Sequence, residues 1–202
     1  MKAHAGLIFF TLILAGCAGP NPNPGERTAD IAWISGRYSD AFQTVKPHAE
    51  AGRPWAQLRL AMFYAHGMGV PKDIKAAIEW YEKAAAQKTD GAWADGQMVG
   101  ATGRYGYFNQ NSDARIAQRN LAVIFLDGKG VEKDLVRAYL NIRTVVEEQN
   151  GKPLFFCCEF SGGAGRWFLP QDLTKIYQDV VSQMSPEQKA EAEMRYAQLK
   201  KK

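Results

Sequence analysis

The chain has 202 residues, and its 25 lysines and arginines against 21 acidic residues give a formal net charge of +4. The basic residues are scattered, apart from three lysines at the end of an expected C-terminal helix, where cations complement the helix dipole. This distribution argues against a nucleic-acid reader, which needs a concentrated basic face. The length favours one elongated domain with a hydrophobic core and no second domain.

The N-terminus differs in composition from the rest of the chain. A short basic start is followed by an apolar run from Ala5 to Leu14, which has the length of a signal-peptide core and is too short to span a bilayer. The run ends in Leu14-Ala15-Gly16-Cys17, which resembles the lipobox of bacterial lipoproteins. The resemblance implies a signal peptide over residues 1–16 and a diacylglycerol on Cys17. An ordinary signal peptide or an uncleaved anchor is the alternative.

Lipidation would determine where the protein is found. A lipoprotein cysteine carries three acyl chains. A single chain gives only marginal membrane binding, so attachment through three chains would be stable. In the sorting rule of such lipoproteins, Ala18 in place of aspartate implies the periplasmic face of the outer membrane. Proline then alternates with small polar residues from Gly19 to Gly25, which disfavours regular structure. We therefore expect an extended tether over residues 17–28 and a folded domain over residues 29–202.

A duplication organises the centre of the chain. Residues 56–81 return in altered form at 117–142, with Gly67-Met68-Gly69-Val70 matching Gly128-Lys129-Gly130-Val131 and Lys72-Asp73 matching Lys133-Asp134. Each copy predicts a helix, a glycine-rich turn and a second helix. Such a unit cannot bury its apolar face alone, so the sequence predicts an all-α fold, an α-solenoid of stacked helix pairs.

The first copy predicts helices over residues 54–65 and 73–87, with Asp73 as the N-cap of the second helix. With Trp80-Tyr81-x-Lys83-Ala84-Ala85-x-Gln87, it resembles the Sel1-like repeat, a relative of the tetratricopeptide repeat. The second copy, over residues 113–148, has drifted and carries Asn141 at the position of Trp80. The resemblance implies a module that holds protein partners rather than one that catalyses.

Further helices are expected on both sides of the two repeats. Residues 29–52 predict two short antiparallel helices and resemble the degenerate unit that precedes many Sel1-like repeats. A helix is expected over 171–183, followed by a polar terminal helix that begins at the capping box Ser185-Pro186-Glu187-Gln188. Two irregular segments rich in glycine and aromatic residues interrupt this pattern at 88–112 and 150–170, and the first of them could instead contain a degenerate repeat.

The sequence shows no spacing typical of a catalytic or metal site. The glycine pairs at 67/69 and 128/130 follow helices rather than strands, so they are turn residues and not dinucleotide loops. The chain has no His-x-x-x-His motif, no Cys/His ligand spacing and no nucleophile elbow. We therefore expect a protein that is not an enzyme and that uses neither a metal nor a cofactor.

Cys157 and Cys158 are the two thiols besides Cys17. In an oxidising envelope, the one disulfide that these two thiols could form within the chain is a bond between the adjacent residues Cys157 and Cys158. Such a bond is strained, because adjacent α-carbons at about 3.8 Å lie below the usual disulfide range. Two buried free thiols are the alternative, and neither interpretation makes these residues catalytic.

The aromatic residues fall into two groups. Trp55, Tyr64, Trp80 and Tyr81 lie at helical spacing inside the first repeat, which predicts a packing role. The partner-binding candidates come from the irregular segments, where no repeat position requires an aromatic or arginine side chain: Trp93, Tyr105, Tyr107, Phe108, Arg166, Trp167 and Phe168. The alternative for this second group is that these segments fold back onto the inner face of the solenoid.

The family resemblance implies a non-enzymatic lipoprotein that binds proteins. Some lipoprotein members resemble immunity proteins that neutralise lipase effectors delivered by type VI secretion. A membrane tether suits that role, because it raises the concentration of the inhibitor where a lipase acts. An adaptor in envelope assembly or signalling is the alternative. We expect a toxin effector or an envelope component as partner, membrane contact through the lipid anchor, and no nucleic acid.

Overall fold

The computed structural model describes residues 24–87, 112–156 and 166–201. Within them, eight helices and one short hairpin follow one another along the chain. Their bounds are α1 Pro24–Ile34, α2 Tyr38–Glu50, α3 Pro54–His66, α4 Ile74–Ala85, α5 Ser112–Asp127, α6 Leu135–Gln149, β1 Leu154–Phe156, β2 Arg166–Phe168, α7 Pro170–Gln183 and α8 Pro186–Leu199.

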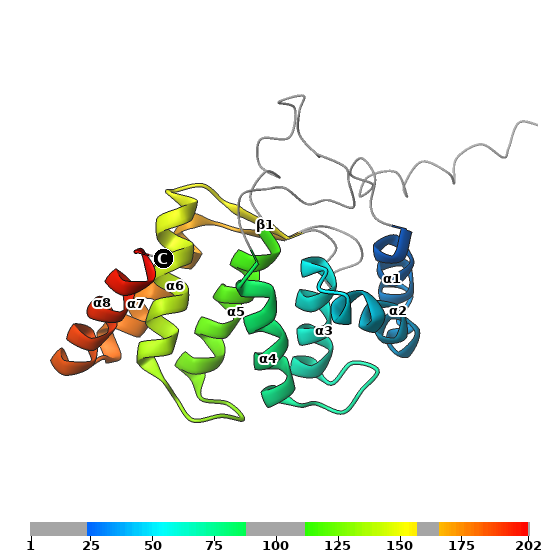
Figure 1. The fold of residues 1–202 in the computed structure, drawn as a ribbon, viewed down its shortest axis with the longest axis horizontal. Helices are drawn as coiled ribbons and strands as arrows, with labels where there is room; N and C mark the ends of the chain where they lie inside the picture. Colours follow the sequence, from blue (N-terminus) through cyan, green and yellow to red (C-terminus); the bar gives the residue numbers. More distant parts are fainter. Residues whose placement is uncertain (1–23, 88–111, 157–165, 202) are drawn as a thin grey trace, which may run out of the picture.

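The helices stack as antiparallel pairs along one direction (Figure 1). The pairs α1/α2, α3/α4 and α5/α6 each pack against the next, and α7 and α8 both pack on α6. The first helices of successive pairs also touch, since α3 contacts α5 and α5 contacts α7. This arrangement confirms the predicted α-solenoid, including the two short helices expected before the first repeat.

The start of α1 differs from the sequence-based expectation. The helix begins at Pro24, inside the segment 17–28 that the proline pattern assigned to an extended tether. Proline is compatible with a helix start because its fixed φ suits the first turn, where the missing N–H has no helical partner. The expected signal peptide and Cys17 lie outside the described residues. Among the described helices, none is long and apolar enough to cross a membrane.

Both repeats close their turns in the same way. Gly67 and Gly128 end α3 and α5 in the left-handed conformation, with φ of +71° and +66°, which glycine adopts without steric cost. Asp73 and Asp134 then begin α4 and α6, and each carboxylate accepts a hydrogen bond from a backbone N–H three residues later, at 3.0 and 2.8 Å. The predicted N-cap at Asp73 is therefore confirmed, and its equivalent recurs in the second repeat.

The second glycine of each turn sets the distance between neighbouring pairs. A Cβ on Gly69 would lie 2.6 Å from backbone atoms of Tyr38 and Ser39, at the start of α2. A Cβ on Gly130 would lie 2.9 Å from the side chain of Ile74, at the start of α4. Each turn thus presses on the second helix of the preceding pair, and only glycine allows this approach.

We expect Gly69→Ala to lower the free energy of unfolding by about 3 kcal/mol, because it combines left-handed strain with a clash against backbone atoms that cannot move aside. The matched control is Gly36→Ala. Gly36 has a similar φ of +72°, but a Cβ there would meet nothing within 4 Å. Chemical denaturation of both variants separates the two effects, and equal losses would show that the close approach of Gly69 to α2 is unimportant.

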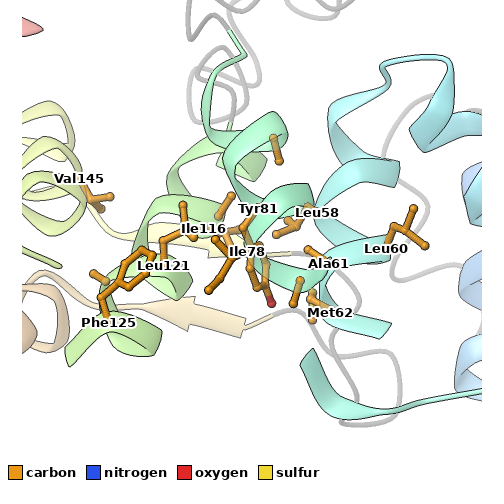
Figure 2. Packing of buried hydrophobic residues seen from close by; sticks show 14 of the residues in the cluster. Leu58, Leu60, Ala61, Met62, Ile78, Tyr81, Ile116, Leu121, Phe125 and Val145 are labelled. Atoms are coloured by element: carbon orange, nitrogen blue, oxygen red, sulfur yellow. The ribbon is translucent and has the colours of Figure 1, made fainter. Parts of the chain in front are cut away.

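The core runs continuously through the stack. Side chains from α3, α4 and α5 interlock in its centre, among them Leu58, Ile78, Tyr81 and Leu121 (Figure 2). Aromatic rings join the first pair to the first repeat, since the Phe63 ring lies 4.6 Å from that of Trp33 in an edge-on contact. The packing role predicted for the repeat aromatics is confirmed: Trp55 and Tyr81 are buried, and Tyr64 and Trp80 pack against the core while partly exposed.

A hairpin forms inside the segment 150–170, which the sequence analysis treated as irregular. Strands β1 and β2 pair antiparallel, with Leu154 opposite Phe168 and Phe155 opposite Trp167. Leu154 and Phe168 are 3% and 4% exposed, and β1 contacts α5. The hairpin is therefore anchored in the core through its first pair of residues.

Polar contacts attach the last two helices to α6. Arg143 donates to Glu147 at 2.6 Å and to the Tyr177 hydroxyl of α7 at 3.0 Å, and the Tyr196 hydroxyl of α8 donates to Glu147 at 3.1 Å. Lys200 also pairs with Glu147, and this hydrogen bond, with those from Arg143 and Tyr196, lowers the pKa of Glu147 to about 2. Lys200, one of the three C-terminal lysines, is exposed and pairs with α6 through Glu147.

Candidate functional site

The first helices of the pairs carry unusual buried polar side chains. Gln57 and Arg59 on α3 and Arg115 on α5 are 5%, 6% and 4% exposed. Buried polar groups are costly unless they are hydrogen-bonded, so each of these side chains requires a partner. Their partners lie on α1, α2 and α5 and at the ends of α4 and α6. This row of helices is therefore the most chemically distinctive part of the described chain.

Arg59 links the first helices of three pairs. Its Nε and Nη2 donate to one carboxylate oxygen of Asp30 on α1, at 3.1 and 2.8 Å. Its Nη1 lies 3.2 Å from a carboxylate oxygen of Glu26, one helical turn earlier. Asp113, in the first turn of α5, also attracts this guanidinium. We call these four residues the Arg59 cluster.

The Arg59 cluster holds more negative than positive charge. Burial raises the pKa of Glu26 to about 7, although Arg59 opposes this shift, and repulsion from Asp113 and Asp30 adds to it. Burial also raises the pKa of Asp113 against the attraction of Arg59. At neutral pH the cluster is therefore poised to hold a proton. Its groups bind one another, so the arrangement acts as an electrostatic link between helices.

We expect the stability contribution of Glu26 to depend on pH. In the folded state the pKa of Glu26 is about 7, above the ordinary value of 4.5. Between pH 4.5 and 7, the folded chain therefore keeps a proton on Glu26 that the unfolded chain has lost. Stability should thus fall as pH rises from 5 to 8, and Glu26→Gln should reduce this fall. Urea denaturation at both pH values measures it, with Glu79→Gln, an exposed residue of α4, as the control. An identical pH dependence in Glu26→Gln and the wild type would contradict the assignment.

A second polar link joins the start of a first helix to the end of its partner helix, and it differs between the repeats. In the first repeat, Gln87 donates to the side-chain oxygen of Gln57 at 3.0 Å. The equivalent positions in the second repeat are Gln118 and Glu148. Arg115 bridges them by donating to Gln118 at 2.5 Å and pairing with Glu148. The same connection is therefore preserved with different chemistry.

The structure describes some of the partner-binding candidates and not others. Phe168 lies in the core, and the guanidinium of Arg119 is 4.8 Å from the centre of its ring. This placement corrects the expectation of an accessible contact and favours the packing alternative for Phe168. Arg166 and Trp167 are neighbours on β2, where the structure describes their backbone alone. The remaining candidates lie outside the described residues, as do the two adjacent cysteines: Trp93, Tyr105, Tyr107, Phe108, Cys157 and Cys158.

The Arg59 cluster was not anticipated from the sequence. The available signal was Arg59 itself, a charged residue between Leu58 and Leu60 in a helix that is buried along most of its length. Across the described part of the chain, no group of three His, Cys, Asp or Glu side chains is arranged to hold a metal ion. What this region provides is a row of helices whose relative positions are fixed by charge as well as by packing.

Stacked helix pairs with equivalent turns and equivalent polar links define an α-solenoid repeat protein. The family model described as Sel1 repeat matches residues 56–88 and 115–140, which correspond to the pairs α3/α4 and α5/α6. The chain therefore contains two Sel1-like repeats, and such repeats suggest a role in binding other proteins.

Known proteins share parts of the chain. The chitin synthase regulator SKT5 of Saccharomyces cerevisiae is 44% identical over 50 residues, which are 25% of this chain and 7% of that protein. A crystal structure of a protective antigen of uropathogenic Escherichia coli strains, described as displaying an SLR fold, covers 87% of this chain and 30% of its own, at 20% identity and a TM-score of 0.55. A Sel1 repeat protein from Oxalobacter formigenes, also 20% identical, covers 81% of this chain and 77% of its own, with a TM-score of 0.26.

Proposed function

We propose that this chain is a lipid-anchored, non-enzymatic protein of the bacterial envelope that binds and neutralises a lipase effector delivered by type VI secretion. The observation that supports a protein-binding role is the pair of Sel1 repeats. These repeats stack through equivalent contacts, and their buried polar groups bind one another. The lipobox at Leu14-Ala15-Gly16-Cys17 supports the membrane address.

The position of α1 supports an inhibitor that works close to a membrane. A lipid on Cys17 would be separated from Pro24, the first helical residue, by at most about 23 Å at about 3.3 Å per residue. The folded stack would therefore remain near the bilayer surface, where an incoming phospholipase must act. Confinement of this kind raises the effective concentration of the inhibitor without any additional contact.

The insertion between the two repeats supports a role in binding. Helices α4 and α5 pack directly against each other although residues 86–111 separate them in sequence. The contact between α4 and α5 therefore does not require the insertion as a spacer. Aromatic and arginine side chains dominate binding hot spots. The proposed contacts are Trp93, Tyr105, Tyr107 and Phe108 from this insertion, with Arg166 and Trp167 from the hairpin.

The proposal predicts that a gene beside this one encodes a lipase, and the test uses that lipase. The purified domain should form a stoichiometric complex with the lipase and abolish its hydrolysis of phospholipid vesicles, and the full-length protein should protect cells that produce the lipase in the periplasm. Cys17→Ser should retain the complex but protect less well. Undiminished hydrolysis in the presence of excess domain would contradict the proposal. Co-purification with a secretion or cell-wall assembly complex would instead support the adaptor role, and sustained turnover of an ester, glycan or peptide substrate would establish an enzyme.

A further inference from the structure

Helix α1 lies at one end of the stack (Figure 1). Its outer face is apolar. Ala29, Ala32 and Trp33 point into the core, which is the face expected of a packed helix. The opposite face carries Ile31 and Ile34, which are 50% and 49% exposed. Solvent-facing helix positions are normally polar, so two large aliphatic side chains three residues apart form an unusual surface.

This apolar face is held in a fixed orientation. Glu26 and Asp30, on the same helix, are paired with the buried Arg59 of α3. The Trp33 ring packs edge-on against Phe63, also on α3, at 4.6 Å. Because α1 is attached by charge and by aromatic packing, Ile31 and Ile34 cannot turn inward without breaking both contacts.

The neighbouring charges favour an apolar partner surface over an acidic one. Arg37, the residue before α2, lies 3.5 Å from Asp40, and Lys46 on α2 lies 4.0 Å from Glu50, so both basic side chains are paired with carboxylates. A surface that bound by charge would need unpaired lysines or arginines, and neither of these two described side chains is unpaired. The occupant best suited to this face is therefore hydrocarbon.

We infer that Ile31 and Ile34 insert into the lipid surface to which the chain is anchored, so that α1 forms the membrane-facing end of the solenoid. This inference rests on the proposed lipidation of Cys17, because α1 is the first described helix after that residue and begins seven residues beyond it. With the anchor in place, insertion is an intramolecular step, so even a small apolar face contributes. The rest of the stack then projects away from the membrane.

Site-specific photocrosslinking in cells tests this orientation with the full-length, processed protein. Ile31→p-benzoylphenylalanine and Ile34→p-benzoylphenylalanine should yield adducts with phospholipid after irradiation. Met194→p-benzoylphenylalanine is the matched control, because Met194 is a 57% exposed apolar residue on α8, at the opposite end of the stack. Mass spectrometry of the same samples reports the acylation of Cys17 and the identity of each adduct.

Lipid adducts at positions 31 and 34 but not at 194 would support the inference. If Cys17 is acylated but position 34 crosslinks to a second copy, to another protein or to nothing, the orientation is wrong while the anchoring proposal stands. Equal lipid adducts at 194 would also overturn the orientation. If Cys17 is not acylated, both the anchoring proposal and this inference fail.

Discussion

Leu121→Asp is expected to destabilise the fold by about 4 kcal/mol or more, enough to unfold a typical domain of marginal stability. Leu121 is 2% exposed and lies at the centre of the interlocked side chains of α3, α4 and α5 (Figure 2). An aspartate there would leave a buried charge without a partner and would also remove the packed leucine side chain. Circular dichroism during urea denaturation measures the loss.

Leu199→Asp is the control for this substitution. Leu199 is the last residue of α8 and is 53% exposed, so the same change in chemistry should alter stability by no more than about 1 kcal/mol. The comparison tests the register of the second repeat, because Leu121 corresponds to the buried Leu60 of the first. Similar effects of the two substitutions would mean that α5 does not present Leu121 to the core.

Arg59→Met should cost about 3–5 kcal/mol at pH 7, because it leaves the carboxylates of Glu26, Asp30 and Asp113 without their cation. Methionine nearly preserves the volume of the arginine side chain. The loss of stability would therefore result from the missing charge rather than from a cavity. The defect should shrink as pH is lowered toward 5, where Glu26 in the folded chain binds a proton.

Two further variants distinguish charge imbalance from lost packing. Combining Arg59→Met with Glu26→Gln and Asp30→Asn should recover much of the lost stability, since replacing all partners of a buried ionic group is tolerated better than removing one. Arg195→Met removes an exposed arginine paired with Glu191 at 3.2 Å and should cost at most about 1 kcal/mol. No recovery in the combined variant would show that the Arg59 cluster does not act through charge.

The repeats could be predicted closely because their signals are local. Three of these signals act within a few residues of sequence. They are the glycine that ends the first helix of each repeat, the aspartate that caps the second helix, and the capping box at Ser185. The structure places these elements within a residue or two of their predicted bounds. Duplication strengthened the prediction further, since the second copy repeats the same local signals.

The parts that escaped prediction depend on contacts between distant residues. Arg59 has Asn120 at the equivalent position of the second repeat, so the repeat pattern contains no hint of the Arg59 cluster, whose acids come from α1 and α5. Phe168 is buried because the hairpin packs on α5, and periodicity does not reveal such a docking. The early start of α1 reflects competition between proline as a helix start and proline as a component of an extended tether.

We expect partner binding and folding to depend on different residues, and the most direct test measures both affinity and stability for Tyr107→Ala and Trp167→Ala. With the proposed lipase effector as partner, each substitution should raise the Kd by about 30-fold, which corresponds to about 2 kcal/mol, while the Tm stays within about 2 °C of the wild type. Phe168→Ala serves as the contrasting variant and should lower the Tm because Phe168 is buried in the core. A large fall in Tm for Tyr107→Ala and Trp167→Ala, with the affinity of the folded fraction unchanged, would contradict the claim and assign these aromatics to packing.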